Sequence, residues 1–121
     1  MIAARSHQDL IAWQEAMRLV EMIYRHTALF PKEEIFGLTT QLRRSAVSIP
    51  SNIAEGAARN SSRELLQFLG IANGSLAELQ TQLEIAARLG YLNAGAECSG
   101  QVSRVGKLLI GLRKSIRDRD V

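Results

Sequence analysis

The residues best suited to chemistry lie between Ala46 and Gly56, where the sequence reads Ala-Val-Ser-Ile-Pro-Ser-Asn-Ile-Ala-Glu-Gly. Two serines, an asparagine and a glutamate interrupt a pattern that otherwise indicates a buried helix, and polar residues that break a local pattern are candidates for function. A serine nucleophile would need a histidine as general base and a third group to orient that histidine. The sequence offers no such trio, so we expect no catalytic residues.

Metal and cofactor chemistry also lacks the residues that it needs. A two-metal site in a helical bundle requires Glu-x-x-His pairs, but neither His7 nor His26 follows a glutamate by three positions. Clusters of cysteine and histidine that could bind zinc are missing, and no strand precedes a glycine-rich phosphate loop. We therefore expect a non-enzymatic protein without a cofactor or a metal.

Cysteine usage and hydropathy favour the cytoplasm. The single Cys98 excludes an intramolecular disulfide and fits a reducing compartment. We expect no signal peptide, because a polar segment follows Arg5. No apolar run approaches the ~20 residues that span a bilayer, so no membrane partner is expected.

Helical periodicity covers nearly all of the chain, and strand signals are almost absent. The sequence predicts helices over about residues 8–28, 33–59, 62–89 and 94–117. The third helix begins after Ser61 or Ser62, either of which can cap it. The apolar face expected for the first helix consists of Leu10, Trp13, Met17, Val20 and Tyr24, and that expected for the second begins at Ile35.

Pro50 falls inside the second helix, where it removes a backbone hydrogen bond at a cost of roughly 3 kcal/mol. A helix that is kinked but continuous is favoured over one that stops near Ser48 and restarts, because the apolar period continues to Ala57. Short connections between four long helices then predict one all-α domain over residues 1–121. The expected fold is an antiparallel up-down-up-down four-helix bundle with the second helix kinked at Pro50.

On a helix, the polar residues of the central stretch share one face, which is too rich in short side chains to be ordinary solvated surface. Three interpretations stay open: local bonds around Pro50, with Glu55 paired to Arg59 or Arg63; an interface between subunits; and a ligand or RNA contact. Gly70 and Gly74 lie within the third helix, where each lowers helix stability by about 1 kcal/mol relative to alanine. This cost suggests that the backbone of another helix approaches closely at these positions. The candidate motif and interface residues are Ser48, Pro50, Ser51, Asn52, Glu55, Gly56, Gly70, Gly74 and Glu78.

The chain is mildly basic, with a formal net charge of +3 and an isoelectric point near 9.5. Basic residues gather near the C-terminus, where some also complement the dipole of a helix end. Arginine and lysine neutralise phosphates without regard to base sequence. The candidates for such contacts are Arg43, Arg44, Arg59, Arg63, Arg104, Lys107, Arg113, Lys114 and Arg117.

Four segments carry a resemblance to a known family. They are Leu10-Ile-Ala-Trp13, Phe30-Pro31 with Glu34-Ile-Phe-Gly-Leu38, the run from Gln41 to Gly56, and Gly74-Ser-Leu-Ala-Glu-Leu79. Over roughly residues 8 to 117, the chain resembles the four-helix bundle proteins encoded in the intervening sequences of bacterial 23S ribosomal RNA genes. The long central motif is the most specific part of this resemblance, and the fourth helix is the least distinctive.

The resemblance implies an antiparallel bundle that assembles into a ring, with a homopentamer favoured. It also implies a relation to the basic accessory proteins of diversity-generating retroelements, which work with nucleic acid and a reverse transcriptase. Many members of the family are encoded away from ribosomal RNA genes, so the resemblance does not imply a role in ribosomes.

Two functions are compatible with these features. The favoured one is a non-enzymatic oligomer that binds nucleic acid, RNA above DNA, because five copies of this chain would carry about +15 and attract phosphates. The alternative is a protein–protein interaction scaffold with no direct role in nucleic-acid binding, whose basic residues are simply solvated.

Overall fold

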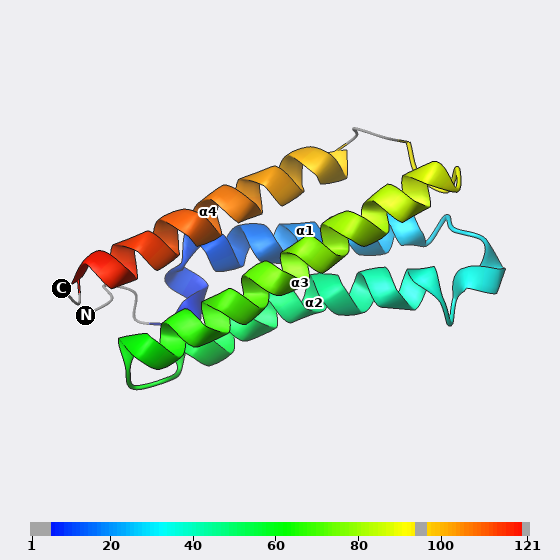
Figure 1. The fold of residues 1–121 in the computed structure, drawn as a ribbon. Coiled ribbons are helices and arrows are strands. Elements are labelled where there is room, and N and C mark those ends of the chain that lie inside the picture. The colour runs from blue at the N-terminus through cyan, green and yellow to red at the C-terminus, as the bar shows by residue number, and fades with distance from the viewer. Residues whose placement is uncertain (1–5, 94–96, 120–121) are drawn as a thin grey trace.

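Four long helices make up the fold of the computed structural model, which describes residues 6–93 and 97–119. Successive helices run side by side in opposite directions (Figure 1), and each packs against the next, with the last closing the square against the first. The predicted all-α up-down-up-down bundle is confirmed. The helices are α1 (Ile11–Thr27), α2 (Leu38–Ala57), α3 (Ser62–Arg88) and α4 (Glu97–Arg119), with short 3-10 helices η1 (His7–Asp9) and η2 (Lys32–Glu34).

The core consists of aliphatic side chains that recur every three or four positions on each helix. Because this spacing keeps one stripe of every helix facing inward, all four helices contribute to a single apolar cluster. The largest side chains that are fully buried are Leu19, Ile23, Leu42, Ile49, Ile53, Leu69, Leu79, Val105 and Leu109.

The buried face of α1 is shifted from the predicted one: Leu10, Trp13 and Val20 pack against the core but are only partly buried. Within the predicted stripe, Met17 and Tyr24 are 40% and 43% exposed. A second stripe with the same spacing lies one position earlier, and its Ala12 and Ala16 allow closer helix packing than Trp13 and Met17 would. The buried face of α1 therefore contains Ala12, Ala16, Leu19, Ile23 and Thr27.

The start of α2 also differs from the prediction. Pro31 and the glutamates form the separate turn η2, and α2 begins only at Leu38. A carboxylate oxygen of Glu34 accepts a hydrogen bond from the Leu38 amide at 3.1 Å, while Gly37 takes backbone angles of −116° and −115°, outside the helical range. Ile35, expected in the core, is instead 54% exposed.

The remaining helix ends lie close to their predicted positions. The Ser61 hydroxyl accepts a hydrogen bond from the Glu64 amide at 3.1 Å and caps α3. Two residues after the last residue of α3, Gly90 has a φ of 81°, a left-handed conformation that suits glycine at a helix end. The predicted start of the fourth helix near Ala94 lies outside the described residues.

The helix α2 continues through Pro50, which is buried. It does not stop near Ser48 and restart, so the favoured interpretation of this segment as one helix is confirmed. The kink at Pro50 stays a prediction.

A close approach between helices occurs at Gly56, where α2 packs against α3. A Cβ atom added there would lie 2.9 Å from the Phe68 Cβ and 3.3 Å from the Leu65 carbonyl oxygen. Added at Gly70 or Gly74, it would meet nothing within 4 Å. The close approach expected at Gly70 and Gly74 therefore does not occur within one chain.

We expect Gly56→Ala to lower the free energy of unfolding by about 1–3 kcal/mol, because the new methyl group overpacks the contact between α2 and α3. Urea denaturation followed by circular dichroism measures this change. The matched control is Gly111→Ala on α4, where a Cβ would meet nothing within 4 Å; it should gain up to about 1 kcal/mol from helix propensity. An unchanged unfolding midpoint for Gly56→Ala would contradict the close approach.

Candidate nucleic-acid interface

Basic residues from two distant parts of the sequence lie at the same end of the bundle (Figure 1). Because the helices alternate in direction, the C-terminal turns of α4 lie at the same end as the turn between α2 and α3 (Figure 1). We call this set of five side chains the basic end. It consists of Arg59, Arg63, Arg113, Lys114 and Arg117.

Most of the basic end is available to a ligand. Arg63, Lys114 and Arg117 are exposed, and none of them forms an ion pair with a carboxylate in the part of the chain that the structure describes. Arg113 is half-buried, and its Nε has no hydrogen-bond partner among the described residues. Arg59 is more constrained: it pairs with Glu55 at 2.9 Å and lies 4.8 Å over the Phe68 ring.

The excess of positive charge lies in the half of the bundle that contains the basic end. Residues 6–18, 48–75 and 106–119 together contain eight basic and five acidic side chains, with the excess in 106–119, whereas the described residues of the other half contain six of each. This half therefore carries the whole net charge of the described residues. Such a one-sided distribution creates a positive potential that attracts anionic polymers.

Arg104 is held within the subunit instead. Its Nε donates to a carboxylate oxygen of Glu15 at 3.0 Å, and Gln101 donates to the same oxygen at 3.0 Å and to the Glu15 carbonyl at 2.8 Å. Glu15 is buried on α1, so this cluster links α1 to α4. The sequence does not reveal this partner, because Glu15 lies far from Arg104 along the chain. Lys107, one turn later, is exposed.

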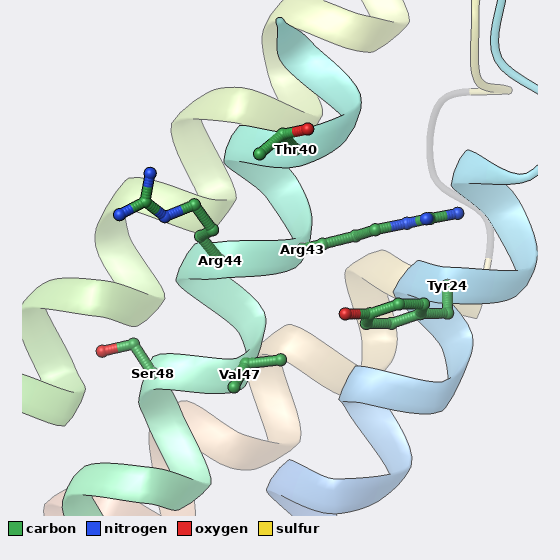
Figure 2. Close-up of a pocket in the computed structure, with 6 residues that line it drawn as sticks. All are labelled: Tyr24, Thr40, Arg43, Arg44, Val47 and Ser48. Atoms are coloured by element: carbon green, nitrogen blue, oxygen red, sulfur yellow. The ribbon is translucent and has the colours of Figure 1, made fainter. Parts of the chain in front are cut away.

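Arg43 and Arg44 lie away from the basic end, in a groove between α1 and α2 (Figure 2). Arg43 donates from Nε to the Thr27 hydroxyl at 2.9 Å, and its guanidinium carbon lies 4.5 Å from the centre of the Tyr24 ring. Arg44 is exposed and points to the other side of α2. The α1–α2 groove is open to solvent, has a volume of about 450 Å³ and is lined by Tyr24, Thr40, Arg43, Arg44, Val47 and Ser48.

The polar stretch around Pro50 makes mostly local bonds. Ser51 donates to the Val47 carbonyl at 2.8 Å, and Asn52 donates to the Ser48 carbonyl at 2.8 Å and to its hydroxyl at 2.9 Å. Neither bonds the Ala46 carbonyl that Pro50 leaves without its helical donor. These bonds follow the local interpretation, with side chains after Pro50 bonding to backbone carbonyls that precede it.

One bond of this stretch reaches another helix. The hydroxyls of Ser48 and Ser75 lie 2.7 Å apart and link α2 to α3. A turn earlier, Ser45 donates to the Gln82 side chain, a buried contact that the sequence does not indicate, because both residues resemble surface polar positions. The polar face of α2 is therefore partly a seam between α2 and α3.

The other candidates for the interface between subunits differ in their exposure to solvent. Glu55, Gly74 and Glu78 are exposed, and Gly70 is half-buried.

Among the described residues, no group of three or more histidine, cysteine, aspartate or glutamate side chains is arranged to hold a metal ion. None of the described helices has a stretch long and apolar enough to cross a membrane.

Residues 8–111 match the family model described as 23S rRNA-intervening sequence protein, which covers α1, α2, α3 and most of α4. A search of curated proteins finds no match to the chain.

We expect the link between Glu15 and Arg104 to make stability depend on pH. The hydrogen bond from Gln101, followed by that from Arg104, lowers the pKa of Glu15 below its ordinary value of 4.5. A carboxyl whose pKa is lower in the folded than in the unfolded state stabilises the fold above pH 4.5, and this contribution is lost as pH falls through the folded pKa. Urea denaturation at pH 7 and pH 3 should therefore show a larger acid-induced loss for the wild type than for Glu15→Gln.

The control is Glu84→Gln, which removes an exposed carboxylate paired with Arg88. Exposed ion pairs contribute little, so its loss of stability on acidification should match that of the wild type. The same acid-induced loss in Glu15→Gln and wild type would contradict a stabilising role for this carboxylate.

Proposed function

The chain belongs to the 23S rRNA-intervening sequence protein family, and from this premise we propose a non-enzymatic, cytoplasmic oligomer that binds nucleic acid, RNA above DNA. The observation that carries this proposal is the basic end, where Arg63, Lys114 and Arg117 are exposed without a carboxylate partner among the described residues. Cations in this state release counterions from nucleic acid when they contact phosphates, and that release drives binding.

The chemistry of the basic end suits the backbone of nucleic acid more than its bases. Arg63, Lys114 and Arg117 are exposed near helix ends, so their long side chains reach outward without a rigid frame. Phosphate contacts of this kind position a protein on nucleic acid without reading its sequence. Binding should therefore be tolerant of sequence and strongly dependent on salt.

An oligomer is supported by an exposed stripe along α3. Ile71 and Ile85 are 47% and 44% exposed at its two ends, and Gly74 lies between them with no atom near its missing Cβ. A helix of another subunit could approach closely over Gly74 and cover both isoleucines. We call this set the α3 stripe, and it consists of Ile71, Gly74, Glu78, Thr81 and Ile85.

A homopentameric ring is the assembly that we propose, in line with the resemblance. Five basic ends would then contact one RNA together, and several weak contacts on one polymer raise the overall affinity. The relation to accessory proteins of diversity-generating retroelements belongs to the same proposal, since those proteins also work with nucleic acid.

A protein-interaction scaffold is the second candidate, and one observation favours it. Phe36 and Leu29 are 95% and 84% exposed at the end of the bundle opposite the basic end. Large apolar side chains left this open often mark contacts with another protein. Partner capture from a lysate that survives nuclease treatment would support the scaffold, whereas loss of all partners would count against it.

Filter binding to a structured RNA tests the nucleic-acid proposal. We expect the binding constant to fall steeply with salt, and the double variant Lys114→Gln/Arg117→Gln to reduce the log–log slope by about one for each phosphate that the variant no longer neutralises. The control is Arg88→Gln, which removes a cation that is paired with Glu84 outside the basic end. An affinity no better than that of a neutral protein of similar size would end the proposal.

Light scattering of Gly74→Leu tests the α3 stripe. The side chain would enter open space within the subunit, so the helix should fold, while a neighbouring helix could no longer approach. We expect the mass to fall toward that of the monomer. Gly111→Leu, on the surface of α4 with equally open space, should leave the mass unchanged; unchanged mass for Gly74→Leu as well would exclude the α3 stripe as the interface.

A further inference from the structure

The α1–α2 groove has features that phosphate contact alone does not require. It lies away from the basic end, and it combines an aromatic ring, a fixed guanidinium and an apolar side chain with a second, exposed arginine (Figure 2). We propose that this groove binds one unpaired nucleotide of an RNA strand, with the base against Tyr24, Arg43 and Val47 and a phosphate of the same strand at Arg44, across α2. This inference rests on the proposed nucleic-acid function and assigns part of it to a specific site.

Arg43 is held in place before any ligand arrives. Its Nε donates to the Thr27 hydroxyl at 2.9 Å, and that hydroxyl in turn donates to the Ile23 carbonyl at 2.7 Å. The guanidinium also lies 4.5 Å over the Tyr24 ring. A guanidinium fixed in this way loses little conformational entropy on binding, and its flat face is a surface on which nucleic-acid bases stack.

The apolar part of the groove is left open to solvent. Tyr24 is 43% exposed and Val47 is 40% exposed, although both side chains carry apolar surface that is commonly buried. The volume of about 450 Å³ falls within the range of sites that hold small molecules. A flat heterocycle would cover this surface and stack beside the Tyr24–Arg43 pair, as bases do on aromatic platforms.

The charge of the groove selects an anionic ligand. Arg43 and Arg44 are the charged side chains among its six lining residues, and none of the six is acidic. Arg44 is exposed and makes no ion pair with the described residues. Arg44 points to the other side of α2 from Tyr24 and Arg43 (Figure 2). A nucleic-acid strand matches this layout, because it presents flat bases and charged phosphates at successive points along its length.

The hydroxyls of the groove are already in use. Thr40 donates to the Ile35 carbonyl, and Ser48 bonds to Ser75 and accepts from Asn52. Few groups remain to read the edges of a base, so stacking and charge should dominate. The groove should therefore accept any base, but only from a strand whose bases are unpaired.

The position of the groove on α2 connects it to the basic end. Fifteen residues separate Arg44 from Arg59, which corresponds to ~22 Å along a helix. Arg44 lies on α2 and Arg59 lies two residues beyond its last residue, with Ser48, Asn52 and Glu55 between them along the helix. One flexible strand could therefore occupy the groove while its neighbouring phosphates reach the basic end.

Photo-crosslinking tests the site directly. A single-stranded oligouridylate that carries 4-thiouridine is irradiated with the full-length protein, and tryptic peptides that bear the crosslink are identified by mass spectrometry. We expect the peptide of residues 19–25, which contains Tyr24, to be the main product from the N-terminal half of the chain. Crosslinks confined to peptides of the basic end would overturn the proposal for the groove.

Affinity for matched single-stranded and duplex RNA provides a second test by fluorescence anisotropy. Tyr24→Leu should weaken single-strand binding at least ~5-fold, the lower range for one base–aromatic stack, and leave duplex binding within about 2-fold. Tyr24→Phe keeps the ring and should bind like the wild type. Arg43→Gln should reproduce the loss with the tyrosine intact, which keeps the test valid if Tyr24→Leu folds poorly.

The outcomes separate the two proposals. Steep salt dependence with no effect of Tyr24→Leu or Arg43→Gln would overturn the groove and leave nucleic-acid binding by the basic end in place. No binding to either RNA at low salt would overturn both. Binding of polyglutamate with the same dependence on Tyr24 would assign the groove to an acidic polypeptide and also overturn the proposal.

Discussion

The contact between α2 and α3 at Gly56 determines how the rest of this bundle is arranged. With no side chain on Gly56, α2 lies against Leu65 and Phe68 at a distance that alanine would not permit. Further along the same seam, Ser48 bonds to Ser75 and Ser45 bonds to Gln82. A small residue at one end and paired polar groups along its length thus fix the register of the two helices, which a purely apolar seam would leave less defined.

This register determines which charged side chains lie at the same end of the bundle. The turn between α2 and α3 places Arg59 and Arg63 at the end of the bundle where the antiparallel topology also brings the last turns of α4. Two clusters of basic residues that are far apart in the sequence therefore lie at the same end of the bundle (Figure 1). Toward the opposite end, carboxylates pair with the nearby basic groups, as Glu97 does with Arg25 and Glu84 with Arg88. The asymmetry of charge therefore follows from the fold rather than from the modest net charge.

Much of the fold could be predicted, because long helices with strict apolar spacing and short connections have few ways to pack. The prediction of the fold was wrong where two local structures were compatible with the same apolar pattern. In α1 two apolar stripes have the same spacing, and the alanines of one decide which is buried. At the start of α2 the carboxylate of Glu34 caps Leu38 from four residues away and Gly37 leaves the helical conformation, so a pattern that suited one long helix produces two elements.

The candidate site was predicted less completely than the fold. Residue type and position identified the cations of the basic end, but not which of them are engaged. Arg104 bonds to Glu15 across the bundle, and Arg43 bonds to Thr27 and lies over Tyr24. These partners depend on the packing of helices that are distant in sequence, so periodicity alone could not reveal them. The same packing holds Arg43 in a fixed position within the α1–α2 groove.

The measurement that tests the central claim most directly is sedimentation of the purified protein, alone and mixed with a structured RNA, at low and high salt. An oligomeric nucleic-acid-binding protein should sediment as one species several times heavier than the 13.3 kDa chain, move with the RNA at low salt and separate from it at high salt. A 13.3 kDa monomer that sediments apart from the RNA even at low salt would contradict the claim.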